Sequence, residues 1–152
     1  MKKIFTLVVI AGLFMNSCGK KEEMVEYTPM IAGTWKLSKI AVISGKDGNI
    51  ISSVTAKDCD LMNTYEFKND NTFEFKKYSG GGCSTMNSET GNYDYQNSPS
   101  INKLVMKFSN QPNPKEYVVQ TLTELELQYY SLPLQDMNND GIMDKTVVYM
   151  HK

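Results

Sequence analysis

The sequence predicts an all-β domain whose short antiparallel strands form a meander, closed into a barrel or packed as a sandwich. From Trp35 onward, apolar residues alternate with polar ones, and helical spacing is nearly absent. Short links rich in Gly, Asn, Asp and Pro separate the alternating runs. The clearest pair of runs covers residues 64–68 and 72–76, where apolar residues two apart flank Asn69-Asp70-Asn71, as in a tight hairpin.

The other strands follow in order along the chain. The first run begins at Trp35 and continues, after an expected bulge, to Val42. Further strands are expected at residues 50–55, 93–95, 104–108, 117–122, 125–129 and around 147–149, with one helical turn near 58–63. This makes about eight or nine strands. Closing such a meander into a barrel would remove its two open edges.

The first 17 residues predict a signal peptide that is not part of the fold. Lys2 and Lys3 precede the apolar run from Ile4 to Met15, which is too short to span a membrane. The run ends at Ser17-Cys18, which resembles the cleavage motif of bacterial lipoproteins. That resemblance implies that Cys18 becomes N-terminal and lipid-modified. The alternative is an ordinary cut near Ser17 that leaves a free thiol.

Residues 18–30 are polar and charged, and they predict a flexible tether between the lipid and a domain at 31–152. Lys21-Glu22-Glu23 resembles the signals that send some lipoproteins to the outer face of the outer membrane. We therefore expect an outer-membrane lipoprotein of the cell envelope, on the periplasmic or the surface face, held to the membrane by its lipid.

The charge pattern argues against a nucleic-acid partner. The formal net charge is −1, no arginine is present, and lysines form no group larger than an adjacent pair such as Lys76-Lys77. Catalysis also finds little support. The single histidine, His151, lies next to the end, so no Ser-His or Cys-His arrangement suggests itself, and we expect no enzyme.

An ordered set of motifs carries a family resemblance. Gly33-Thr34-Trp35 opens the first strand, Cys59 and Cys83 lie on either side of the hairpin, and Gly91-Asn92-Tyr93 opens a later strand. Together they resemble bacterial lipocalin-like lipoprotein domains. The resemblance implies an up-and-down antiparallel β-barrel of about eight strands.

In that family the tryptophan closes one end of the barrel, so the resemblance implies a structural role for Trp35. The family pattern also places a late arginine across the indole, and this chain has none. Lys152 or His151 is the substitute that the sequence offers.

With Cys18 assigned to lipid, Cys59 and Cys83 remain as an even pair in an exported protein, and this predicts a disulfide. The alternative is a metal pair, for which two thiols and His151 are a poor zinc set.

The segment from Asp136 to Asp144 resembles a calcium-binding loop of the EF-hand type. Oxygen side chains occupy loop positions one, three, five and nine, glycine occupies position six, and a backbone carbonyl serves at position seven. The expected ligands are Asp136, Asn138, Asp140, the carbonyl of Ile142, and Asp144. Val147 replaces the usual glutamate at position twelve, so weak affinity is expected. The alternative is a plain Asn/Asp/Gly turn. No other cofactor is expected.

Two functions stay open at this level. An eight-stranded barrel can hold one small ligand, or it can be filled by its own side chains. The first case predicts a small apolar ligand, with candidate lining residues Tyr65, Phe67, Phe73, Phe75, Tyr93, Tyr95, Met106 and Tyr129. The second predicts a structural or protein-interaction subunit at the cell envelope.

Overall fold

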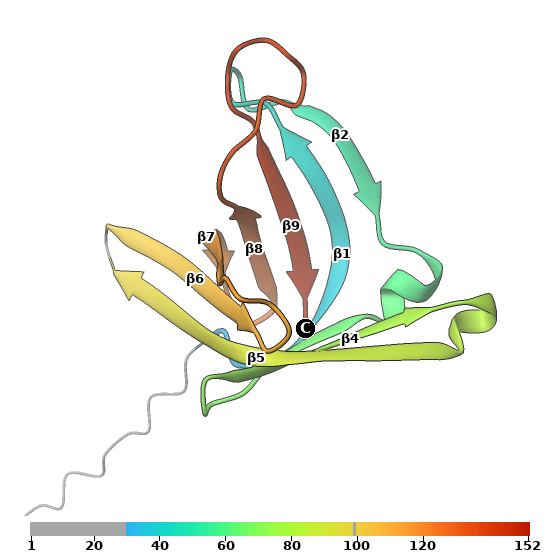
Figure 1. Ribbon diagram of the computed structural model, residues 1–152. Helices are drawn as coiled ribbons and strands as arrows, with labels where there is room; N and C mark the ends of the chain where they lie inside the picture. Colours follow the sequence, from blue (N-terminus) through green and yellow to red (C-terminus); the bar gives the residue numbers. More distant parts are fainter. Residues whose placement is uncertain (1–29, 99) are drawn as a thin grey trace, which may run out of the picture.

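The computed structural model describes residues 30–98 and 100–152 (Figure 1). The predicted signal peptide, Cys18 and nearly all of the tether lie outside these residues, and those assignments stay predictions. The strands are β1 (Gly33–Ile43), β2 (Ile50–Thr55), β3 (Thr64–Phe67), β4 (Thr72–Ser79), β5 (Thr85–Ser98), β6 (Ile101–Phe108), β7 (Lys115–Leu122), β8 (Glu126–Ser131) and β9 (Lys145–His151). Two short 3-10 helices, η1 (Asp58–Met62) and η2 (Gly81–Cys83), precede β3 and β5. No helix in this part of the chain is long and apolar enough to cross a membrane.

The strands form one closed antiparallel barrel. From β3 to β9, each strand pairs with the next one along the chain, and β9 returns to pair with β1. β1 shares one edge between two partners, because its first half pairs with β3 and its second half pairs with β2. Eight strands therefore close the barrel, and β2 is an extra strand beside the upper half of β1 (Figure 1). The predicted eight-stranded barrel is confirmed.

A bulge in β1 decides which of its residues face inward. Leu37 pairs with Met150 of β9, but the next β9 residue, Tyr149, pairs with Lys39, so Ser38 is an extra residue. The Ser38 hydroxyl donates a hydrogen bond to the Tyr149 carbonyl at 3.1 Å. Because the bulge shifts the alternation by one, the inward positions run from Trp35 and Leu37 to Ile40 and Val42.

One end of the barrel is closed by Trp35, whose side chain is fully buried. Its Nε1 donates a hydrogen bond to the Ile31 carbonyl at 2.7 Å. Lys152 covers the ring, with Nζ 4.5 Å from the ring centroid, and donates a hydrogen bond to the Ala32 carbonyl at 2.8 Å. Lys152 therefore takes the place that the resemblance gives to an arginine, whereas His151 is exposed at the end of β9.

Above Trp35, aromatic side chains pack edge to face. The ring centroids of Phe67 and Tyr93 lie 5.0 Å apart, and so do those of Phe73 and Phe108. Gly91 lies against Phe73, and no larger residue fits at this position, because a Cβ there would lie 2.1 Å from the Lys107 carbonyl oxygen. These rings pack with buried aliphatic side chains from the other strands into one hydrophobic core.

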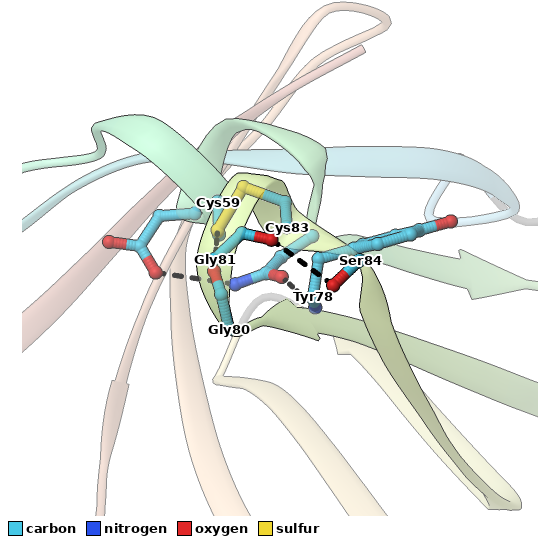
Figure 2. The surroundings of a disulfide bond; sticks show 8 residues. Cys59, Tyr78, Gly80, Gly81, Cys83 and Ser84 are labelled. Carbon is cyan, nitrogen blue, oxygen red and sulfur yellow. Dashed lines mark hydrogen bonds between the residues drawn. A yellow bond between two sulfur atoms is a disulfide. The ribbon is translucent and has the colours of Figure 1, made fainter.

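The predicted disulfide between Cys59 and Cys83 is confirmed (Figure 2). It joins η1 to η2, the turn at the tip of the β4–β5 hairpin. A hydrogen bond beside the disulfide joins the same two segments: the buried side chain of Asn63 accepts it from the Tyr78 backbone N–H at 2.8 Å. The tip of this long hairpin is therefore held against the segment that precedes β3.

Candidate functional site

The inward side chains become more exposed with distance from Trp35. On β3, Phe67 is buried and Tyr65 is half-buried; on β4, Phe73 is buried and Phe75 is half-buried. On β1 the gradient continues to Ile40, which is 38% exposed although it faces inward. The barrel therefore has a packed floor at the Trp35 end and an accessible mouth at the opposite end.

Five inward residues surround this mouth, and we call them the mouth cluster: Tyr65, Phe75, Glu89, Tyr117 and Tyr129. The rings of Tyr65 and Phe75 are stacked, with centroids 4.1 Å apart. On the β7–β8 side of the barrel, Tyr117 and Tyr129 meet edge to face at 5.0 Å. Glu89 is half-buried on β5, directly opposite Phe75. The cluster thus combines apolar ring faces with three hydroxyls and one carboxyl.

The three tyrosine hydroxyls lie in a poorly solvated environment. Burial raises the pKa of Tyr129 well above its ordinary value, with further contributions from Tyr65 and Tyr117. Burial also raises the pKa of Tyr65, and so do Tyr117 and Glu89. For Tyr117, burial alone raises the pKa. All three hydroxyls are therefore neutral hydrogen-bond donors at physiological pH.

We expect the raised tyrosine pKa values to make the fold sensitive to alkali. Above pH 10, the ordinary tyrosine pKa, the unfolded chain loses hydroxyl protons that the buried tyrosines retain, so rising pH favours unfolding. Each such tyrosine should lower the free energy of unfolding by about 1.4 kcal/mol per pH unit in this range. Below pH 10 these groups add no pH dependence. Urea unfolding between pH 8 and pH 11 measures how steeply the free energy of unfolding falls with pH. In the Tyr129→Phe variant this slope should be smaller by about 1.4 kcal/mol per pH unit above pH 10. A flat profile up to pH 11 would contradict the expectation.

The structure separates the predicted lining residues into two groups. Phe67, Phe73, Tyr93 and Met106 belong to the packed floor and are at most 4% exposed. Three of the others, Tyr65, Phe75 and Tyr129, belong to the mouth cluster, whereas Tyr95 lies toward the opposite end of the barrel, which the β3–β4 and β5–β6 turns share. Tyr95 donates a hydrogen bond from its hydroxyl to Asn102 at 2.7 Å, next to the β5–β6 turn.

Two members of the mouth cluster were not among the predicted lining residues. Tyr117 alternates with the buried Val119, and this spacing was visible in the sequence. Glu89 lies two residues before Gly91 in a polar segment that shows no apolar alternation. Its inward position follows only from the pairing of β4 with β5.

Comparison with known proteins gives the family. The model of the lipocalin-like domain matches residues 31–129. The chain belongs to the lipocalin-like domain family. The comparison with curated proteins found no match.

Two solved structures are similar to this lipocalin-like chain. One is a lipocalin-like protein from Bacteroides uniformis, 15% identical, with a TM-score of 0.49, covering 79% of this chain and 97% of its own. The other is an uncharacterized protein from Bacteroides eggerthii, 12% identical, with a TM-score of 0.46, covering 78% of this chain and 97% of its own.

A small hollow lies at the rim of the lipocalin-like barrel. It has a volume of about 130 Å³ and is lined by Ser131, Thr146, Asp144 and the segment 133–135. Ser131 lies two residues beyond Tyr129 on β8, and Thr146 lies two residues before Val148 on β9, so alternation places both on the inward side. Beyond the mouth cluster, the inward face of the barrel therefore continues with the polar side chains of Ser131 and Thr146.

The segment with calcium-loop spacing follows β8 and forms a turn stabilised by its own side chains. The Asp136 carboxylate accepts hydrogen bonds from the backbone N–H groups of Asp140 and Gly141, at 3.2 and 2.8 Å. The side-chain oxygen of Asn138 accepts a hydrogen bond from the Asp140 backbone N–H, and the Asp140 carboxylate accepts one from the Ile142 backbone N–H. No cluster of three or more His, Cys, Asp or Glu residues suited to a metal ion occurs in the described parts of the chain. The calcium site stays a prediction of the sequence.

Asp144 connects this segment to the β1–β2 turn through hydrogen bonds. Its side chain is 2% exposed, and its two carboxylate oxygens accept hydrogen bonds from the backbone N–H groups of Gly45 and Met137, at 3.0 and 2.8 Å. Gly45 belongs to the β1–β2 turn, where a Cβ would lie 2.0 Å from the Met143 carbonyl oxygen. Asp144 thus joins two loops at the mouth end of the barrel.

Replacing Asp144 with asparagine is expected to lower the free energy of unfolding by about 1–2 kcal/mol. An amide has a single acceptor oxygen, so one of the two backbone N–H groups loses its partner. Urea unfolding of wild type and variant measures the difference. Asp94→Asn, at an exposed position of β5, is the matched control and should change stability by less than about 0.5 kcal/mol. Equal effects of the two substitutions would contradict this role for Asp144.

Proposed function

We propose that this chain is a lipid-anchored protein of the cell envelope whose lipocalin-like barrel binds a small apolar ligand at the mouth cluster. The packed floor around Trp35 supports the barrel, and the half-buried rings of Tyr65, Phe75 and Tyr117 offer apolar surface for a ligand. Ligand sites in proteins are mostly apolar, with a few polar groups that fix orientation. The lipocalin-like family is generally non-enzymatic.

The observation that carries the proposal is the state of the Tyr129 hydroxyl. Within residues 30–98 and 100–152, it has no hydrogen-bond partner, although the side chain is only 6% exposed. No fully enclosed side-chain nitrogen or oxygen in these residues lacks a partner, so this hydroxyl borders accessible space. A buried donor that faces such space supports a site in which a ligand supplies the acceptor.

Binding of Nile red, a neutral dye that fluoresces in apolar surroundings, tests the proposal. We expect saturable binding to wild type and about tenfold weaker binding to Tyr117→Ala, because this substitution removes one ring of the mouth cluster. Tyr130→Ala is the matched control, since Tyr130 lies on the outer face of β8, 5.2 Å from the ammonium group of Lys145. Absence of saturable binding, or equal weakening by both substitutions, would refute the proposal.

The lipid anchor is tested separately. The full-length chain expressed in a bacterial host should incorporate radiolabelled palmitate and sediment with the outer membrane. Cys18→Ser should abolish labelling and release the protein, because the modified thiol is lost. Unchanged labelling of the Cys18→Ser chain would refute the anchor and leave the ligand site unaffected.

A further inference from the structure

Strand β2 is the one strand of the described residues that pairs on a single side. Its only partner is β1, and no strand lies along its other edge (Figure 1). Just after β2, the Ala56 backbone N–H donates a hydrogen bond to the Ser38 carbonyl of β1 at 2.8 Å. Successive residues of an antiparallel strand direct their backbone groups to opposite sides. The N–H and C=O groups of Ser53 and Thr55 therefore point away from β1, toward the free edge.

This edge lacks the usual protection against another strand. Edge strands commonly carry lysine, proline or a bulge that discourages pairing. β2 has neither a charge nor a proline, and all of its side chains are exposed. Its bulge, at Ile51, disturbs only the start of the strand and leaves Ser52 to Thr55 in regular register with β1. Val54, within this regular part, is 65% exposed. The edge is therefore suited to pair with a further strand.

The charges next to β2 indicate which kind of strand fits. Lys46-Asp47 precedes β2 and Lys57-Asp58 follows it, so each flank has one charge of each sign. All four side chains are exposed, and none forms an ion pair in the described residues. A strongly charged partner gains no attraction from such an edge. Antiparallel pairing of two copies brings one neutral flank against the other, without repulsion.

We propose that this chain forms a homodimer in which the β2 edges of two copies pair antiparallel about a two-fold axis at Val54. In this register, Ser53 of each copy exchanges backbone hydrogen bonds with Thr55 of the other. Val54 lies opposite its own counterpart in a non-hydrogen-bonded pair, where side chains across the strands are closest. The contact is isologous and uses the single free edge of each copy, so assembly stops at two.

The dimer also extends the inward face of the barrel. Val54 pairs with Ile40 of β1, and both side chains lie on the face that points toward the mouth. Across the axis, this face continues from Val54 of one copy to Val54 and Ile40 of the other. The six residues of β2 span only about 20 Å. The interface is small, so a dissociation constant on the order of 10–100 μM is expected.

Sedimentation equilibrium of the full-length chain, in a density-matched non-ionic detergent at concentrations up to about 500 μM, tests this inference. We expect wild type to show a monomer–dimer equilibrium. Val54→Lys should raise the dissociation constant at least tenfold, because two ammonium groups then meet at the axis. The exposed position should leave the circular dichroism spectrum and the urea midpoint unchanged. Val54→Ile should keep the dissociation constant within about twofold.

Asn92→Lys is the matched control, because Asn92 is equally exposed to solvent on β5, where both edges are paired. It should leave the dissociation constant unchanged. A wild-type chain that stays monomeric over the whole range would overturn the inference, and the edge would then be open to a strand from another protein. Equal weakening by Val54→Lys and Asn92→Lys would overturn it as well.

Cysteine cross-linking tests the register in the full-length Cys18→Ser chain. The Cα atoms of a non-hydrogen-bonded pair lie about 4.5 Å apart, within the reach of a disulfide. Mild oxidation should therefore link two copies of the Val54→Cys chain. Ser53→Cys should link far less, since each Ser53 faces Thr55 of the other copy, and Asn92→Cys should not link. Equal linking of Val54→Cys and Asn92→Cys would mean random collision, and stronger linking at Ser53→Cys would exclude an axis at Val54.

Discussion

Replacing Trp35 with alanine is expected to lower the free energy of unfolding by about 4–5 kcal/mol. The indole is fully buried at the closed end of the barrel, so its removal leaves a cavity that the fixed strands around it cannot fill. The Ile31 carbonyl would also lose the hydrogen bond it accepts from Nε1. A loss of this size is a large part of the total stability of a typical domain. Urea unfolding followed by far-ultraviolet circular dichroism measures it.

Two further variants separate the contributions of the indole. Trp35→Phe keeps an aromatic ring and removes the N–H donor, and a cost of about 2 kcal/mol is expected. Lys152→Met removes the cation over the ring and the hydrogen bond to Ala32, and a cost of about 1 kcal/mol is expected. If Trp35→Ala cost less than about 1 kcal/mol, Trp35 would not close the barrel.

The local elements of the fold followed directly from the sequence. Alternation located β2 at Ile50–Thr55 and indicated a bulge in β1 before Ile40, which the structure places at Ser38. The hairpin turn before β4 also follows local chemistry, because Asn71 has a positive φ, which asparagine tolerates better than most residues. The cysteine pair was predictable because it depends on export and on an even count rather than on distant packing.

The features that needed the structure depend on contacts between distant parts of the chain. The local sequence predicts Asp144 as a calcium ligand, yet its carboxylate accepts a hydrogen bond from Gly45, which lies 99 residues away. The first half of β5 carries no apolar pattern, so the sequence gives no sign that Glu89 faces the barrel interior. Strand pairing sets this orientation, and a single-residue shift in register would turn Glu89 outward.

The separation between floor and mouth was hidden for a related reason. Phe73 and Phe75 look alike in the sequence, and both face inward. Only the stagger of the strands brings Phe73 beneath Phe108 and leaves Phe75 stacked on Tyr65 near solvent. Composition and alternation therefore predict which side chains enter a barrel, whereas the depth of each depends on how the strands are offset.

Removing the disulfide, in the Cys59→Ser/Cys83→Ser double variant, is expected to lower the free energy of unfolding by about 3 kcal/mol. The two cysteines are 24 residues apart, and opening a loop of this length releases chain entropy in the unfolded state. The hydrophobic core lies elsewhere, so the barrel should keep its circular dichroism spectrum and its Nile red binding. Thermal unfolding of the double variant should match that of wild type in dithiothreitol.

The change should be concentrated at the tip of the β4–β5 hairpin, because the disulfide joins that tip to η1 (Figure 2). The Tyr78 amide reports on this region, since it donates to Asn63 and should exchange its hydrogen faster once the disulfide is absent. The Tyr93 amide, within the barrel floor, should keep the protection that global stability allows. Exchange that rises equally at both amides, beyond the global loss, would show that the disulfide supports the whole barrel. A double variant within about 0.5 kcal/mol of wild type would show that η1 and Asn63 hold the hairpin tip without it.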